Sequence, residues 1–104
     1  MTSLAPLEAT RYCILLALSR RALHGYGIVE QIDKDAGSLV RLDYSTVYKC
    51  LKRLEQDSFI KRVSKPDDRQ IRYNLTPRGR RALILETDRL ERATHLVRER
   101  FKRD

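Results

Sequence analysis

A β-hairpin interrupts a chain whose other periodic segments have helical spacing. Residues 59–63 and 71–75 have the composition of short strands, and apolar and polar side chains alternate in the second. Ile71, Tyr73 and Leu75 are therefore expected on one side of the sheet. Residues 64–70 between the two runs are charged and contain Pro66, which is typical of a turn. Because 104 residues have room for one domain, this hairpin has to pack against the flanking helices.

Four segments have the apolar spacing of helices. They are residues 7–19, residues 25–36, a segment that begins at Asp43, and residues 77–102. Gly37 is expected to end the second in a left-handed cap, and residues 20–23 and 38–42 are expected to be connections. Asp43 and Thr76 are the expected N-caps of the last two helices, and Pro77 suits a first helical turn.

The third helix has one apolar face and one polar, basic face. Its apolar stripe recurs at spacings of three and four, through Val47, Cys50, Leu51 and Leu54. The opposite face consists of Ser45, Thr46, Lys49, Lys52, Arg53 and Gln56, with Tyr48 at its margin. Burial of the stripe therefore predicts which side chains reach solvent.

Three helices, a hairpin and a last helix follow one another in the order of a winged helix-turn-helix domain. We predict a mainly α fold with a small β-hairpin. Residues 1–76 form the winged helix-turn-helix DNA-binding domain and residues 77–104 a C-terminal dimerisation helix, in one compact unit. In such a fold the third helix enters the major groove, where lysine and arginine reach guanine edges or phosphates. Lys65 and Arg69 at the hairpin tip are expected to position the domain on the flanking backbone rather than to select sequence.

The charge of the chain agrees with a polyanionic partner. Lys plus Arg number 22 against 14 Asp plus Glu, a net charge of +8, and eight basic residues lie between Lys49 and Arg72. From charge alone, a nucleic-acid face and an ordinary solvated surface both remain open.

Enzymes and membrane proteins are disfavoured by the same sequence. There are two histidines and two cysteines, with no nucleophile–base pair or metal-type spacing, so neither catalysis nor a cofactor is expected. The longest apolar run, residues 13–18, is too short to span a bilayer, and no leader opens the chain. We therefore expect a cytoplasmic location and no membrane partner.

Four blocks of sequence resemble the PadR family of bacterial transcriptional regulators. They are Leu23-His24-Gly25-Tyr26-Gly27-Ile28, Ser45-Thr46-Val47-Tyr48, Leu51-Lys52-Arg53-Leu54-Glu55 with Phe59-Ile60, and Arg72-Tyr73-Asn74-Leu75-Thr76-Pro77-Arg78-Gly79. Their order and spacing match over about residues 8–85. The chain departs from the family at Asp43-Tyr44-Ser45-Thr46, where Ser-Pro-Gly-Thr is usual. A bulky tyrosine thus enters the first turn of the third helix.

The resemblance implies a homodimeric DNA-binding repressor, associated with a bacterial or archaeal nucleoid and often relieved by a small ligand. Two recognition helices related by a two-fold axis are then expected on a near-palindromic double-stranded operator. The single C-terminal helix resembles the smaller subfamily, whose members dimerise through that helix. The residues expected to contact DNA are Tyr26, Tyr44, Ser45, Thr46, Tyr48, Lys49, Lys52, Arg53, Lys65, Arg69 and Arg72. The alternative is a winged-helix adaptor that binds another protein without specific DNA binding, since fold does not fix function.

The last helix also predicts a dimer from its own pattern. Leu83, Leu90 and Val97 recur every seven residues, and Ala93 and Phe101 widen the stripe. A helix of this length extends beyond the core that could cover it, which leaves an exposed apolar stripe in a monomer. Leu7 and the apolar first helix offer a second surface for the same partner.

Four other side chains allow two interpretations each. Tyr48 either contacts phosphate through its hydroxyl or packs against the second helix. Cys13 and Cys50 suggest a redox switch or a metal site, but their places on apolar stripes favour core packing. His24 could sense pH, whereas the resemblance favours a structural bond from its imidazole to backbone.

Overall fold

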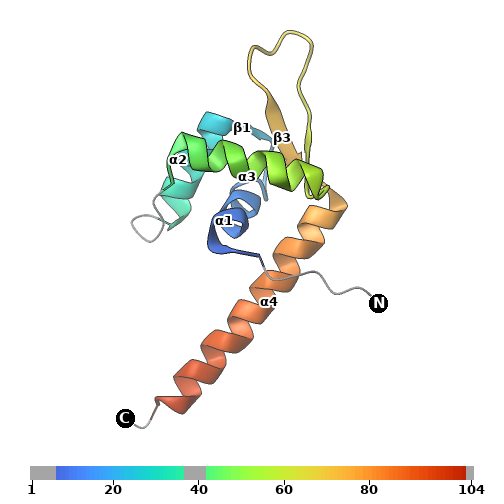
Figure 1. The fold of residues 1–104 in the computed structure, drawn as a ribbon. Helices are drawn as coiled ribbons and strands as arrows, with labels where there is room; N and C mark the ends of the chain where they lie inside the picture. The colour runs from blue at the N-terminus through green and yellow to red at the C-terminus, as the bar shows by residue number, and fades with distance from the viewer. Residues whose placement is uncertain (1–6, 37–41, 103–104) are drawn as a thin grey trace.

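The computed structural model of the chain describes residues 7–36 and 42–102. Its elements are α1 (Ala9–Ala17), β1 (Leu23–His24), α2 (Gly25–Ala36), α3 (Tyr44–Gln56), β2 (Ile60–Arg62), β3 (Arg72–Leu75) and α4 (Pro77–Arg100). Helices around a small antiparallel sheet confirm the predicted fold class (Figure 1). The cap expected at Gly37 lies outside the described residues. Within the described ranges, no helix is long and apolar enough to cross a membrane.

The sheet contains one strand more than the expected hairpin. Its order is β1-β3-β2, all antiparallel, and in the hairpin Ile60 pairs with Leu75 and Arg62 with Tyr73. The connection expected at residues 20–23 ends in strand β1, which pairs with β3. A strand of two residues is too short to show alternation in sequence. The strand predicted at residues 71–75 begins one residue later, and Ile71 before it is 42% exposed, whereas Tyr73 is buried.

Helix α1 lies at the centre of the core. It contacts α2, α3 and α4. Its fully buried side chains meet those of the other helices, in a set formed by Ile14, Leu15, Leu18, Ile28, Val47, Leu51 and Leu54. The helix is two residues shorter at each end than the expected 7–19, and Leu7 packs against the core just before it. The apolar stripe of α3 is thereby fixed inward.

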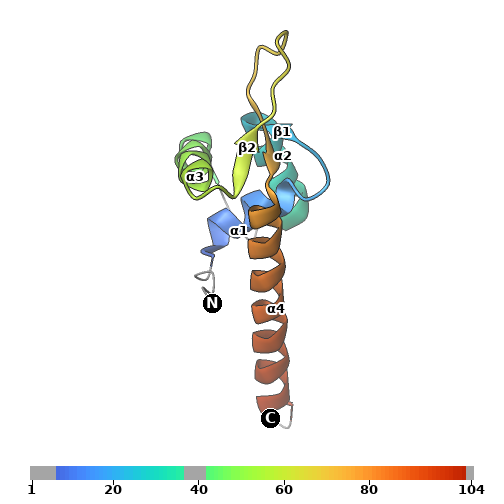
Figure 2. The same ribbon diagram turned by 90° about the vertical axis from the view of Figure 1, so that its right-hand side faces the viewer.

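Helix α4 begins on the sheet and then leaves the domain. The Thr76 side chain accepts a hydrogen bond from the Gly79 N–H at 3.0 Å, and Pro77 occupies the first turn, which confirms both expected features. The buried residues of α4 are Gly79, Ala82, Leu83 and Glu86. From residue 90 onward every described residue is exposed. The wing is the hairpin of β2, β3 and the loop between them. Figures 1 and 2 show α4 running away from the domain, on the side opposite to the wing.

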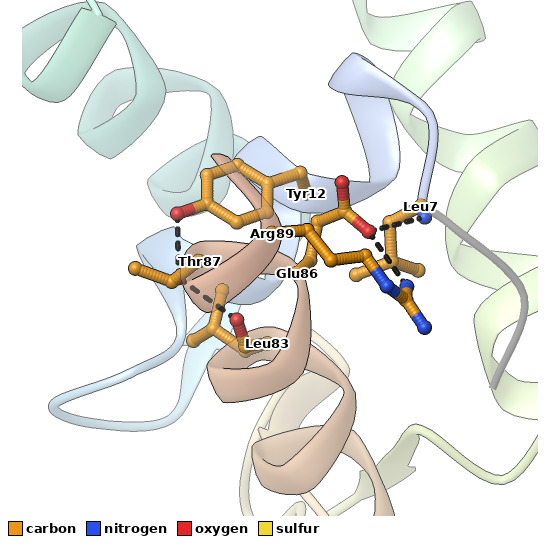
Figure 3. A network of polar contacts seen from close by, with 6 residues as sticks. All are labelled: Leu7, Tyr12, Leu83, Glu86, Thr87 and Arg89. Carbon is orange, nitrogen blue, oxygen red and sulfur yellow. Dashed lines mark hydrogen bonds and ion pairs between the residues drawn. The ribbon is translucent and has the colours of Figure 1, made fainter. Parts of the chain in front are cut away.

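A polar network fixes α4 against the N-terminal side of α1 (Figure 3). The Glu86 carboxylate accepts from the Leu7 N–H and from Arg89 Nη1, each at 3.1 Å. The Tyr12 and Thr87 hydroxyls lie 2.7 Å apart, and Thr87 Oγ1 also donates to the Leu83 carbonyl. These contacts determine the direction in which α4 projects.

Candidate nucleic-acid interface

The first turn of α3 is held by its cap. The Asp43 carboxylate accepts from the Thr46 N–H at 2.7 Å and from Ser45 Oγ at 3.0 Å. These bonds, led by the backbone N–H of Thr46, lower the pKa of Asp43 below its ordinary value. The cap predicted from sequence is therefore confirmed, and the N-terminal end of α3 has a fixed backbone.

The outer face of α3 has the predicted composition. Val47, Leu51 and Leu54 are buried. The exposed side chains opposite them are Ser45, Lys49, Lys52, Arg53 and Gln56, with Thr46 half-buried. Lys49 and Lys52 make no ion pair with any residue that the structure describes. Their charges are therefore available to an external anion.

Arg53 differs from the two lysines because it has an acidic neighbour. Its Nε lies 3.5 Å from Asp57 Oδ2, which also lies 3.5 Å from Arg11 Nη1 on α1. The Arg53 side chain remains 67% exposed. Asp57 thus joins the C-terminal end of α3 to α1, a role that no sequence periodicity signalled.

Three tyrosines surround the beginnings of α2 and α3. The Tyr26 and Tyr44 rings are stacked, with centroids 5.4 Å apart and planes at 22°. Burial, followed by a hydrogen bond with the Tyr26 side chain, raises the pKa of Tyr44. The Tyr48 ring lies against Gly25, where a Cβ would come within 2.7 Å of its hydroxyl, yet half of the side chain is exposed. Tyr48 therefore packs on α2, and its phosphate contact stays a prediction.

His24 has the structural role that the resemblance favoured. Its Nδ1 accepts a hydrogen bond from the Gly27 N–H at 3.1 Å, so the imidazole satisfies a backbone donor in the first turn of α2. His24, Tyr26, Tyr48, Arg69 and neighbouring wing residues line an open groove of about 280 Å³. This groove connects the start of α2 with the wing.

The wing is organised by one of its own acids. The Asp68 carboxylate accepts from the Lys65 N–H at 2.9 Å and lies 3.8 Å from Arg72 Nε. Ser64 Oγ accepts from the Arg72 N–H. Lys65 and Arg69 are exposed. The tip thus presents two cations on a loop that is hydrogen-bonded internally.

The basic cluster is partly neutralised within the chain. Arg62 makes two hydrogen bonds to the Glu55 carboxylate, at 3.0 and 3.3 Å, which raise the pKa of Arg62 and join β2 to α3. Arg53 and Arg72 also have acidic neighbours. A count of basic residues in the sequence therefore overstates the charge that this surface offers.

Neither cysteine has the surroundings of a reactive thiol. Cys13 and Cys50 are partly buried against the core, as the sequence favoured, and burial raises the pKa of both thiols. Among the residues that the structure describes, no group of three metal-ligating side chains occurs.

The residues expected at a dimer interface fall into two groups. Leu83 is 7% exposed within the protomer core, and Leu7 is half-buried. Leu90, Val97 and Phe101 are 45%, 54% and 65% exposed, and Ala93 is exposed beside them. Leu83 therefore offers little surface to a partner, and the free apolar stripe begins at Leu90.

Comparison with known proteins identifies relatives of this arrangement. The model of the transcriptional regulator PadR-like family matches residues 14–84. A PadR family transcription regulator from Clostridium difficile is 26% identical, with a TM-score of 0.75 over 90% of this chain and 98% of its own. Bacillus subtilis PadR in complex with operator DNA is 26% identical, with a TM-score of 0.65 over 73% of this chain and 46% of its own.

A more distant structure shares the fold. The PcaV transcriptional regulator of Streptomyces coelicolor, in complex with its natural ligand, is 23% identical, with a TM-score of 0.73 over 91% of this chain and 63% of its own. No curated protein matches the chain significantly in sequence.

Proposed function

Because the chain belongs to the PadR-like family of transcriptional regulators, we propose that it is a sequence-specific, double-stranded DNA-binding repressor that acts as a homodimer. Family members are regulators rather than enzymes, in agreement with the chemistry of the sequence. The observation that carries the proposal is the outer face of α3, which is capped, rigid and basic, and exposes hydroxyl and amide side chains.

Each part of this face has a separate task on DNA. Lys49 and Lys52 contact guanine edges or phosphates in the major groove, and Ser45 and Thr46 supply hydroxyls at the leading end. Arg53, once released from Asp57, and Tyr48 contact the same strand at the margins. Lys65, Arg69 and Arg72 of the wing position the domain on the backbone.

The projecting part of α4 supports the homodimer. Leu90, Ala93, Val97 and Phe101 continue the helical face that buries Ala82, Leu83 and Glu86 earlier in the same helix. After Glu86 the protomer core no longer covers this face, although its side chains remain apolar. A second copy would cover it and place two α3 helices for a near-palindromic operator.

Repression and its relief follow from the family by analogy. Bacillus subtilis PadR binds operator DNA, and PcaV binds a ligand. A small-molecule effector of this protein would bind between the two α4 helices, where exposed apolar side chains converge in the dimer. We place the protein in the cytoplasm, on the nucleoid.

Binding to DNA selected from a random pool tests this function. Lys49→Ala with Lys52→Ala should weaken binding by about 1–3 kcal/mol per lost base contact, or lower the salt slope by about one unit per lost phosphate contact. The matched control is Arg92→Ala with Arg98→Ala, which removes the same charge from exposed positions on α4. Equal affinity and equal salt slopes for both double variants would refute the assignment.

A further inference from the structure

The stacked pair of Tyr26 and Tyr44 presents carbon surface on an otherwise polar and basic face. The two side chains are 50% and 41% exposed, although each already covers one side of the other's ring. Tyr44 is the first residue of α3, and Tyr26 is in the first turn of α2. Ser45, Lys49 and Lys52 flank the pair along α3. Two adjacent exposed aromatic rings offer a contact surface that suits an apolar group of a partner.

The backbone under both rings is fixed. Asp43 holds the first turn of α3 through the Thr46 N–H, and His24 holds the first turn of α2 through the Gly27 N–H. The stacking of the rings then links the two turns. The pair is thus pre-organised before any ligand arrives, which lowers the entropy that binding would cost.

The chemistry of the major groove leaves one apolar partner for such a surface. The exposed base edges there are hydrogen-bond donors and acceptors, except for the C5-methyl group of thymine. The leading end of the recognition helix is the part that approaches base edges in helix-turn-helix proteins. For the ring carbons of a tyrosine at that end, the thymine methyl group is the most favourable contact on a base edge.

We propose that the Tyr26–Tyr44 pair is a specificity element that recognises thymine methyl groups in the major groove. The inference rests on the proposed function, because it names what the same surface selects. The contact is made by the ring carbons rather than by the hydroxyl. A hydrogen bond from a tyrosine hydroxyl to a phosphate does not depend on which base is present. Contact through the ring carbons should therefore depend on the methyl group, whereas contact through the hydroxyl should not.

The test compares three forms of one DNA site. A site selected from random DNA by the wild-type protein is prepared with thymine, with uracil in place of every thymine, and with 5-bromouracil, whose bromine is close to methyl in size. Wild-type protein should bind the uracil site about fourfold more weakly for each methyl group contacted. This is the affinity expected to be lost when the burial of one group about the size of a methylene is lost. The 5-bromouracil site should restore binding.

Variants assign the effect to the tyrosines. Tyr44→Phe should keep the preference for thymine over uracil, and Tyr44→Ala and Tyr26→Ala should each reduce it, with folding checked by circular dichroism. Lys49→Ala is the matched control, because it removes a neighbouring polar contact and should weaken binding to both sites by the same factor. Tyr26→Ala lies on the other helix, so it still assigns the effect if Tyr44→Ala fails to fold.

The outcomes separate this inference from the function on which it rests. Absence of binding to any DNA would refute the proposed function. Tight binding that is equal for thymine and uracil sites would refute the inference alone. A uracil penalty that survives in both alanine variants would mean that another group contacts the methyl, which also overturns the proposal.

Discussion

Gly79 lies where α4 crosses the start of strand β2, and no side chain fits there. The residue is buried, and a Cβ would overlap the carbonyl oxygen of Phe59 and lie 2.9 Å from its carbonyl carbon. That carbonyl accepts a hydrogen bond from the Thr76 N–H at 3.1 Å. Because the obstacle is hydrogen-bonded backbone, it cannot move aside as the end of a flexible side chain could.

Gly79→Ala should therefore destabilise the protein. Forcing one methyl group into packed structure typically costs about 1–3 kcal/mol of unfolding free energy. Gly27→Ala is the control, since its Cβ would lie at an ordinary 3.6 Å from His24 and Leu23 and alanine favours a helix. Urea unfolding of the two variants measures the difference. Equal stability of Gly79→Ala and wild type would show that the α4–β2 contact is looser than described.

Asp43 makes stability depend on pH in the acid range. Its pKa is lowered in the folded chain, chiefly by the Thr46 N–H, so its contribution is present above the unfolded pKa and is lost as pH falls through the folded value. Asp43→Ala should be less stable than wild type at pH 7, and the gap should narrow below about pH 4. Asp43→Asn, which caps without titrating, is the control. A gap that stays constant between pH 7 and pH 3 would argue against the cap.

Contacts of single side chains mark the limit of sequence-based prediction. The Asp43 cap was predictable because cap, stripe and spacing agree over one helical turn. The pairing of Glu55 with Arg62 and the stacking of Tyr26 on Tyr44 were not, because each joins separate elements whose relative placement is set by packing. For this reason the sequence located the exposed basic face of α3 but not which of its charges are already paired.

At the scale of elements, the position of α4 depends on the polar network around Glu86. A carboxylate on a side chain only 9% exposed accepts from the Leu7 N–H and from Arg89 (Figure 3). When this buried acceptor is removed, the Leu7 N–H loses its hydrogen-bond partner. The network therefore determines the angle at which α4 leaves the core.

Glu86→Ala should lower the free energy of unfolding by about 1–3 kcal/mol, the usual cost of leaving buried hydrogen-bonding groups without partners. Glu86→Gln should lose less, because its amide oxygen can still accept from the Leu7 N–H. Glu91→Ala, at an exposed position on the same helix, should change stability little. Thermal unfolding compares the three. A Glu86→Ala protein as stable as Glu91→Ala would show that α4 docks by apolar packing alone.

The elements themselves differ in how well the sequence specified them. In α3 the N-cap and the apolar periodicity indicate the same start, and in α4 the N-cap and Pro77 do so. The sequence therefore located the starts of both helices. Strand β1 has two residues and gave no pattern. The heptad that includes Leu83 is a single helical face, but the core covers its first part and leaves the rest exposed. Sequence period alone could not show how far along this face the protomer core extends.

At the scale of the molecule, the shape is extended by its last helix. The radius of gyration is 15.3 Å, against about 13 Å for a compact domain of about 100 residues. Figure 2 shows α4 continuing beyond the other elements at one end of the molecule and the wing projecting at the other. An arm with Leu90, Val97 and Phe101 exposed is an unusual surface for a monomer in water.

Leu90→Glu with Val97→Glu should therefore convert a dimer into a monomer at micromolar concentration in analytical ultracentrifugation. The charges would oppose one another across the two-fold axis and would have to be desolvated. Ile84→Glu is the control, since this exposed residue lies about 120° around the helix from Leu90 and should leave the dimer intact. A double variant that stays dimeric would place the interface elsewhere. A wild-type monomer would refute the dimer.

Hydroxyl-radical footprinting of wild-type protein on a site selected from random DNA tests the central claim most directly. Two copies joined through α4, each with its α3 in a major groove, should protect two segments on one face of the duplex. Their centres should lie about 10 base pairs apart, or a multiple of that spacing. Lys49→Ala with Lys52→Ala should shift the protection of both segments together to higher protein concentration, because it weakens binding. A single protected segment at saturation, or protection by this variant at the same concentration as wild type, would contradict the account.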